Sequence, residues 1–127
     1  MGWPYLQSNQ IESLDPNTFS RLVNLTDLWL FRNKLHSLHP HTFRTLVKLK
    51  VLYLEENELT SVHEDTFRGL KNLCWLSLAK NKLETIEKSS FDGLSKLKKV
   101  YLDGNPFSLL DKSWIENGSM KDILDFS

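Results

Sequence analysis

One asparagine recurs along this chain every 24 residues, at Asn9, Asn33, Asn57, Asn81 and Asn105. Phenylalanine keeps the same period from Phe19 to Phe91, and a leucine stands three residues after each phenylalanine. A fixed period of this length is typical of a solenoid, in which each coil buries its apolar side against the neighbouring coils. The apolar positions are spaced three, two and three residues apart, which is not the heptad of a coiled coil.

The length of 127 residues suits one domain rather than two. We therefore predict a single domain over residues 1–127. It divides into repeats at 1–24, 25–48, 49–72, 73–96 and 97–105, followed by a C-terminal cap at 106–127.

The apolar columns describe the cross-section of one coil. Leu28 and Leu30 are two residues apart, so on a strand they share a face, and we expect that face to point into the solenoid. Asn33 stands where the strand must turn a corner inside the stack. Its side chain offers both a donor and an acceptor, so it can satisfy backbone groups of its own coil and of the adjacent coil.

Trp29 and Phe31 lie between and after these leucines, so we expect them to face outward on a parallel sheet. Neighbouring strands are about 4.8 Å apart, so equivalent residues form columns across that sheet. The four columns are Tyr5, Trp29, Tyr53, Ser77, Tyr101; Trp3, Asp27, Val51, Trp75, Lys99; Gln7, Phe31, Glu55, Ala79, Asp103; and Ser8, Arg32, Glu56, Lys80, Gly104.

Exposed aromatic side chains in such columns are typical anchors of binding interfaces. The alternative is that they only pack against each other across the strands. Asp27, Glu55 and Asp103 have no cation in their own column, whereas Arg32, Glu56 and Lys80 alternate in charge. We expect an acidic, aromatic-lined face centred on Glu55 and Glu56, and the alternative is a set of scattered, solvated carboxylates.

Composition excludes several other functions. Sixteen basic residues balance sixteen acidic residues, which gives no argument for nucleic acid as a partner. No apolar run approaches the roughly 18 residues of a membrane helix, and the first residues lack the pattern of a signal peptide. Cys74 is the only cysteine, which excludes an internal disulfide and by itself favours a reducing compartment.

No group of residues predicts catalysis. Column spacing brings His39 and His63 together, but nothing supplies a third ligand, so we predict no metal site. Cys74 lies on the opposite flank from every histidine, which excludes a Cys–His nucleophilic pair. There is also no glycine-rich phosphate loop, and we predict a protein that is not an enzyme and needs no cofactor.

The pattern LxxLxLxxNxLxxLxxxxFxxLxx resembles the typical, 24-residue class of leucine-rich repeat, as found in Toll-like receptor ectodomains and variable lymphocyte receptors. The resemblance implies an α/β-type solenoid, a curved horseshoe. It implies a concave parallel β-sheet of about five strands and an irregular or 3-10 convex side. In such proteins the outward residues of the concave strands bind the ligand. Carried over by position, with Tyr53 added from its aromatic column, the candidate ligand-binding residues are Asp27, Trp29, Phe31, Tyr53, Glu55, Glu56, Trp75, Tyr101 and Asp103.

The C-terminal segment NPFSLLDKSWIENG resembles the cysteine-rich cap of extracellular leucine-rich repeat proteins, with Leu109 and Asp111 in place of cysteines. The resemblance implies a short helical cap in which Trp114 and Ile115 cover the last coil. We further expect Ser119 and Asp122 to cap a final helical turn, which would present Met120, Ile123 and Leu124.

The first coil is degenerate, with Met1 and Pro4 at leucine positions. Either the chain is trimmed there, or this end meets another subunit and supports self-association. Asn24-Leu25-Thr26 and Asn117-Gly118-Ser119 are N-glycosylation motifs that favour an extracellular or cell-surface location, whereas the missing disulfides leave the cytoplasm open.

The resemblance implies non-catalytic, immune-type recognition of a protein or glycan antigen, such as a bacterial surface component. The alternatives are an adaptor or scaffold for one dedicated protein, and a fragment of a larger receptor ectodomain. Neither nucleic acid nor membrane insertion is expected.

Overall fold

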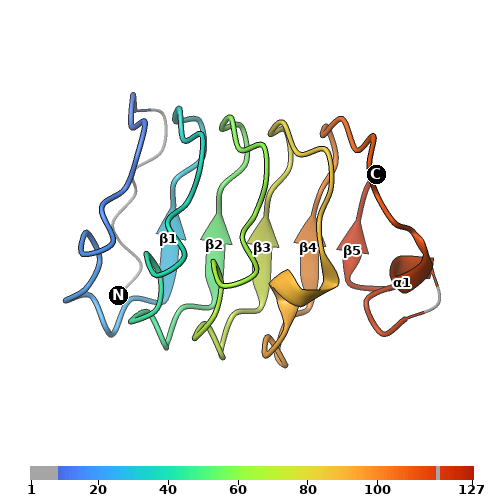
Figure 1. Ribbon diagram of the computed structural model, residues 1–127. Helices are drawn as coiled ribbons and strands as arrows, with labels where there is room; N and C mark the ends of the chain where they lie inside the picture. The colour runs from blue at the N-terminus through green and yellow to red at the C-terminus, as the bar shows by residue number, and fades with distance from the viewer. Residues whose placement is uncertain (1–8, 117) are drawn as a thin grey trace.

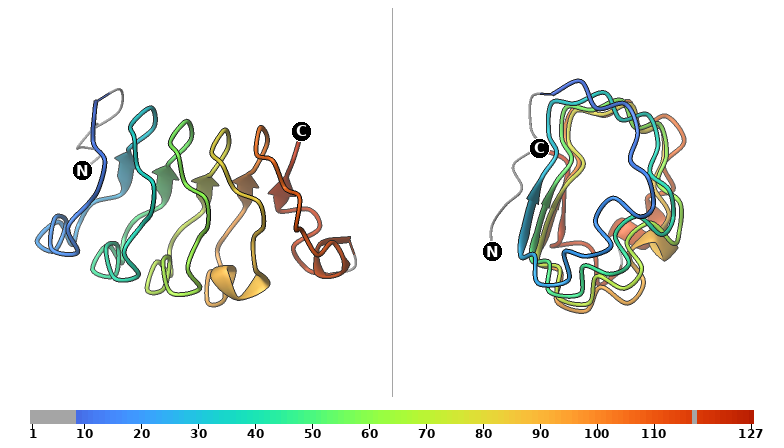
Figure 2. Two further views of the ribbon diagram at one scale, coloured as in Figure 1. Left: turned by 45° about the horizontal axis from the view of Figure 1, so that its top comes forward. Right: turned by 90° about the vertical axis from the view of Figure 1, so that its left-hand side faces the viewer.

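The structure is a computed structural model that describes residues 9–116 and 118–127, and the coils stand side by side in it (Figure 1). Viewed along the stack, the coils follow nearly the same outline (Figure 2). One parallel five-stranded sheet forms one side, in the order β1-β2-β3-β4-β5. Its strands are β1 (Asp27–Trp29), β2 (Val51–Tyr53), β3 (Trp75–Ser77), β4 (Lys99–Tyr101) and β5 (Leu124–Asp125).

The strands pair in the register that the repeat dictates. Leu28 pairs with Leu52, Leu52 with Leu76, and Leu76 with Val100, all of which are fully buried. This register confirms the predicted leucine-rich repeat solenoid with its parallel sheet. Because side chains alternate along a strand, it also fixes which residues of every coil point outward.

The core is the same set of side chains repeated from coil to coil. In the second coil, the residues with no exposed surface are Leu28, Leu30, Leu35, Phe43 and Leu46. The ring of Phe19 stacks on that of Phe43, with 6.1 Å between their centroids. Each coil therefore depends on its neighbours for burial, as expected of a solenoid.

The side opposite the sheet is made of short turns, and its one regular element among the described repeats is the 3-10 helix η1 (Lys88–Phe91). Hydrogen bonds three residues apart close these turns, for example from the Leu46 amide to the Phe43 carbonyl at 3.0 Å. The irregular and 3-10 convex side is therefore confirmed.

The C-terminal segment confirms one prediction and corrects another. The single helical turn α1 (Ser113–Glu116) buries Ile115 and places Trp114 against Phe91, with 6.4 Å between ring centroids, so the covering role of this pair is confirmed. The predicted helical turn that ends in Leu124 is wrong. Residues 119–123 form hydrogen-bonded turns, and Leu124 begins β5.

The physical reason is again the period. Leu124 follows Val100 by one repeat length and pairs with it, and its side chain is buried. The amides of Val100 and Leu102 donate to the carbonyls of Ile123 and Asp125 at 2.9 and 2.7 Å. The fifth strand thus comes from the predicted cap. The strand expected in the first coil, with Trp3, Tyr5, Gln7 and Ser8, lies outside the described residues, as does Asn117.

The asparagines at the corners form a hydrogen-bonded ladder, which we call the asparagine ladder (Asn33, Asn57, Asn81 and Asn105). Asn57 Nδ2 donates to the Leu54 carbonyl of its own coil at 3.0 Å and to the Leu30 carbonyl of the preceding coil at 3.1 Å. Its Oδ1 accepts from the Leu35 amide, also of the preceding coil, at 3.1 Å. The predicted role of the asparagines in bridging two coils is confirmed.

The residue before each ladder asparagine adopts a left-handed backbone conformation. The φ angles are 58° at Arg32, 58° at Glu56, 54° at Lys80 and 74° at Gly104. This conformation costs a residue with a side chain about 1–2 kcal/mol. We conclude that the hydrogen bonds of the asparagine ladder offset that cost in three of the four coils.

Replacement of Asn57 by alanine should destabilise the protein by roughly 1–3 kcal/mol, because it leaves two carbonyls and one amide without this partner in the core. Chemical denaturation followed by circular dichroism measures the change. Asn24→Ala, at an exposed position, is the control and should leave the midpoint unchanged. Equal midpoints for Asn57→Ala and the wild type would contradict the role of the ladder.

Replacement of Gly104 by alanine should be more costly than the same change at Gly93. Both glycines have positive φ, but a Cβ at Gly104 would lie 2.9 Å from Lys80 Cγ and 3.3 Å from Lys80 Cα, whereas nothing lies within 4 Å at Gly93. We expect Gly104→Ala to lose roughly 1–2 kcal/mol more than Gly93→Ala in the same denaturation experiment. Equal losses would show that backbone conformation alone accounts for the effect.

Candidate binding surface on the sheet

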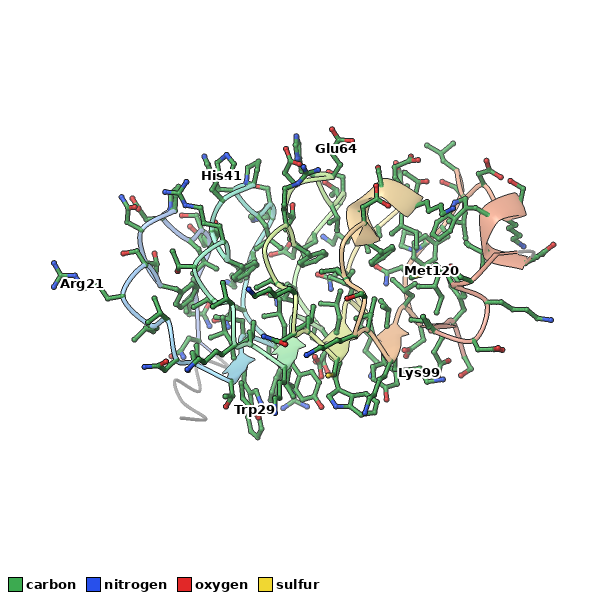
Figure 3. The ribbon with its side chains drawn as sticks, turned by 90° about the horizontal axis from the view of Figure 1, so that it is seen from below. Arg21, Trp29, His41, Glu64, Lys99 and Met120 are labelled. Atoms are coloured by element: carbon green, nitrogen blue, oxygen red, sulfur yellow. The ribbon has the colours of Figure 1, made fainter. Side chains whose placement is uncertain are left out.

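The outward residues of the sheet form a continuous surface, which we call the strand face. The residues on either side of each buried strand centre carry it, and they are at least partly exposed in β1, β2 and β4. Figure 3 shows Trp29 projecting from the strands, whereas His41 and Glu64 lie on the opposite side of the coils. The predicted outward orientation of the residues between the leucines is therefore confirmed.

Three rings of the strand face form an aromatic cluster (Trp29, Phe31 and Tyr53). The centroid of Trp29 lies 6.2 Å from that of Phe31 and 6.2 Å from that of Tyr53. All three side chains are half-buried. Cross-strand packing and exposure thus coexist here, and the cluster leaves aromatic surface available to a ligand.

Trp75 lies apart from this cluster and is the more exposed ring, with 38% of its surface accessible. The Lys98 ammonium sits 5.7 Å from the Trp75 ring centroid, a distance that fits a cation–π contact. In the same row of the sheet, Trp75 pairs with Val51 on one side and with Lys99 on the other.

A hollow of about 430 Å³ opens on the strand face next to the aromatic cluster. We call it the strand-face hollow, and its lining residues are Tyr53, Glu55, Glu56, Ser77, Ala79, Lys80, Tyr101 and Asp103. Ser77 and Ala79 form its floor, with 5% and 7% of their surface accessible. The hollow exists because Ser77 in β3 and Ala79 after it are small. The same columns hold aromatic rings or carboxylates in the neighbouring coils.

Glu55 has an unusual environment for a carboxylate on an outer surface. Its Oε1 is buried and accepts no hydrogen bond from the described residues. Burial raises the pKa of Glu55, and the nearby charge of Glu56 raises it further, while hydrogen bonds from its own backbone and from Ser77 act in the opposite direction. Burial, followed by the charge of Glu55, also raises the pKa of Tyr53.

The charge pattern agrees with the predicted columns at one pair and differs at one residue. Arg32 Nε and Glu56 Oε2 are 3.3 Å apart, as the alternating column predicts. Lys80 makes no ion pair with any described residue, so the predicted three-member alternation ends at Glu56. Asp27, Glu55 and Asp103 also lack an ion pair among the described residues.

The structure therefore sorts the nine candidate residues into groups. The hollow brings together Tyr53, Glu55, Glu56, Tyr101 and Asp103. Trp29 adjoins it through Tyr53, and Phe31 packs against Trp29. Asp27 and Trp75 lie in the row on the other side of the strand centres.

Sequence reasoning missed three lining residues and one strand. Ser77, Ala79 and Lys80 appear in the predicted columns but not among the predicted site residues. The available signal was the small size of Ser77 between two tyrosines. The fifth strand also adds Asp125 beside Tyr101. Hydrogen bonds from Ser127, together with the nearby charge of Lys99, hold the pKa of Asp125 below its usual range.

The remaining candidates do not form a second site. Within residues 9–116 and 118–127, no three His, Cys, Asp or Glu side chains lie close enough to hold a metal ion. His39 Nδ1 and His63 Nδ1 instead accept backbone amides two residues later, at 3.2 and 3.0 Å. Cys74 is a half-buried thiol, and Asn24 of the first glycosylation motif is exposed. Across the described chain, no helix has the length and apolar character needed to cross a bilayer.

Stacked coils with a parallel sheet on one side and turns on the other define a leucine-rich repeat solenoid. The sequence matches the Leucine rich repeat family over residues 5–59 and 47–107, and the chain belongs to this family. Members generally mediate protein–protein recognition and are typically not enzymes. No curated protein sequence matches the chain.

Several solved structures are similar to this chain. The leucine-rich repeat domain of APL1B has 32% identity and a TM-score of 0.73, over 76% of this chain and 29% of that chain. A leucine-rich repeat protein of Leptospira interrogans has 29% identity and a TM-score of 0.78, over 99% of this chain and 30% of that chain.

A chain of the Drosophila Toll–Spatzle complex has 23% identity and a TM-score of 0.81, over 96% of this chain and 16% of that chain. At that identity the similarity concerns the fold alone. This chain spans less than one third of the length of each of these three structures.

Replacement of Glu55 by glutamine should stabilise the protein at neutral pH, with a gain that shrinks on acidification. A carboxyl whose folded pKa is raised destabilises the fold while it is charged, and this penalty disappears as pH falls through the raised pKa towards the ordinary value of 4.5. Melting temperatures between pH 4 and pH 8 measure the effect. The exposed Glu64→Gln is the control, and a constant difference between Glu55→Gln and wild type across this range would contradict the assignment.

Proposed function

We propose that the protein recognises a ligand without catalysis through the strand face, in immune-type binding of a protein or glycan antigen on a microbial or other cell surface. The strand-face hollow is the observation that carries the proposal. It combines aromatic walls, a floor of small residues and two carboxylates, Glu55 and Asp103, that make no ion pair with the described residues. Rigid aromatic groups beside a depression are the usual anchors of protein interfaces.

The proposed binding centre is the hollow, with Tyr53, Glu55, Glu56, Tyr101 and Asp103, flanked by Trp29 and Phe31 on one side and by Asp27 and Trp75 on the other. The five strands span about 19 Å at the usual spacing. This width suits one small epitope, and multivalent display would raise the apparent affinity.

We further propose that the protein acts outside the cell or at its surface, as a single domain over residues 1–127. Exposure of Asn24 leaves that motif accessible to glycosylation. The alternatives are an adaptor for one dedicated protein and a piece of a larger receptor ectodomain. Self-association through the first coil remains a prediction, because that coil's start lies outside the described residues.

A cell-binding assay with matched charge variants tests the proposal. The strand-face variant combines Asp27→Asn, Glu55→Gln and Asp103→Asn, and the control combines Glu64→Gln, Glu87→Gln and Asp92→Asn away from the sheet. Each fluorescent protein is displayed as a streptavidin tetramer and titrated against Gram-negative, Gram-positive and animal cells by flow cytometry. We expect saturable binding to at least one cell type, reduced at least tenfold by the strand-face variant and unchanged by the control.

Two outcomes would contradict the proposal. Equal binding by the strand-face variant and the wild type would exclude the acidic strand face as the contact surface. If the protein showed no saturable binding to any of these cell types, this result would contradict the immune-type function and would favour the adaptor alternative.

A further inference from the structure

The strand-face hollow has the shape of a slot between two tyrosines. Tyr53 pairs with Ser77 in the sheet, and Ser77 pairs with Tyr101, so the two phenol side chains flank one small residue. Two strand spacings separate them by about 10 Å. Ser77 and Ala79 are nearly inaccessible and lie at the floor of this open depression.

The charges of the lining favour a cation. Three carboxylates line the hollow, and only Glu56 has a cationic partner, at 3.3 Å from Arg32. Glu55 and Asp103 make no ion pair with the described residues. Lys80, the one cation of the lining, makes none either, and its stem packs over Gly104, where Cγ lies 2.9 Å from the position of an added Cβ.

Glu55 supplies an acceptor at the wall. Its Oε1 is buried and has no hydrogen-bond partner among the described residues. Hydrogen bonds from its own backbone and from Ser77 already act on this carboxyl group. The Glu55 carboxyl lines the hollow without a cationic partner among the described residues, so it favours a ligand that carries a charged N–H group.

We infer that the strand-face hollow is the socket for one arginine side chain of a protein ligand, held between Tyr53 and Tyr101 and paired with Glu55 and Asp103. This inference rests on the proposed function and specifies the ligand at its site. A guanidinium is planar, stacks on aromatic faces and donates to carboxylates in pairs. The lysine ammonium is a strongly hydrated point charge and lacks the planar group that stacks on an aromatic ring.

Other occupants fit less well. An anion would meet three carboxylates and one ammonium. A metal ion would need three or more ligands within reach, and no such group of His, Cys, Asp or Glu exists in the described parts of the chain. An apolar side chain would leave the Glu55 and Asp103 carboxylates of the lining without a cation.

An NMR titration with a small probe tests the socket directly. The probe is Nα-acetyl-L-arginine amide, and the neutral isostere is Nα-acetyl-L-citrulline amide, each added to the 15N-labelled protein. We expect saturable shifts at the amides of Tyr53, Ser77 and Tyr101 with the arginine probe, and at least tenfold weaker binding of the citrulline probe.

Two variants separate charge from shape. Glu55→Gln removes the charge without changing size and should weaken the arginine probe at least fivefold. Ser77→Tyr continues the tyrosine column, fills the slot and keeps every carboxylate, so it should abolish the shifts. Glu64→Gln should bind as the wild type does, and the spectrum of each variant reports whether it is folded.

Several results would overturn the socket. These are no saturable shift at the three amides, equal binding of the citrulline probe, or wild-type binding by folded Ser77→Tyr. Equal binding of Nα-acetyl-L-lysine amide would overturn the preference for arginine.

The titration and the cell assay can fail separately. If the probe does not bind but the strand-face variant still loses cell binding, the socket is wrong and the proposed function stands. If the probe binds but no cell type does, the proposed function is wrong and the socket stands.

Discussion

The asparagine ladder is the interaction on which the other features depend. A solenoid coil must turn a corner inside the stack, where backbone donors and acceptors are out of reach of water. One side chain per coil satisfies an amide and two carbonyls there, as Asn57 and Asn81 each do. This fixed corner holds three-residue strands in register, although such short strands would be marginal by themselves.

That register turns the strand face into a grid in which the size of one side chain has a local effect. Where the grid holds Trp29, Phe31 and Tyr53, the rings contact each other and cover the sheet. Where it holds Ser77 and Ala79, no large side chain fills the column and a hollow remains between Tyr53 and Tyr101. Recognition chemistry therefore requires no change to the backbone, because the repeat supplies the positions and the outward residues supply the shape.

The sequence alone was sufficient for the repeat, the inward and outward assignments and the bridging role of the asparagines, since all three follow from one period. The sequence was insufficient for features that the repeated residue pattern does not mark. β5 was missed because Leu124 stands alone without the usual leucine pattern around it, and its register shows only when it pairs with Val100. The hollow was missed because its signal is a single small residue, Ser77, between two tyrosines of one column. The left-handed φ at Arg32, Glu56 and Lys80 was missed because glycine marks that position in only one coil.

The bonds that link one coil to the next also give the stack a polarity. Asn81 serves the Leu59 amide and the Leu54 carbonyl, and Asn105 serves the Leu83 amide and the Leu78 carbonyl, in each case one coil towards the N-terminus. A separation between two coils is therefore unequal for the two halves. Of the asparagine bonds, the upstream half loses the acceptor of one amide and one donor to a carbonyl, whereas the downstream half keeps its asparagine and the bond to the carbonyl of its own coil. Hydrogen bonding at the corners therefore has a direction, because the corner of each coil also bonds to the asparagine of the coil that follows it.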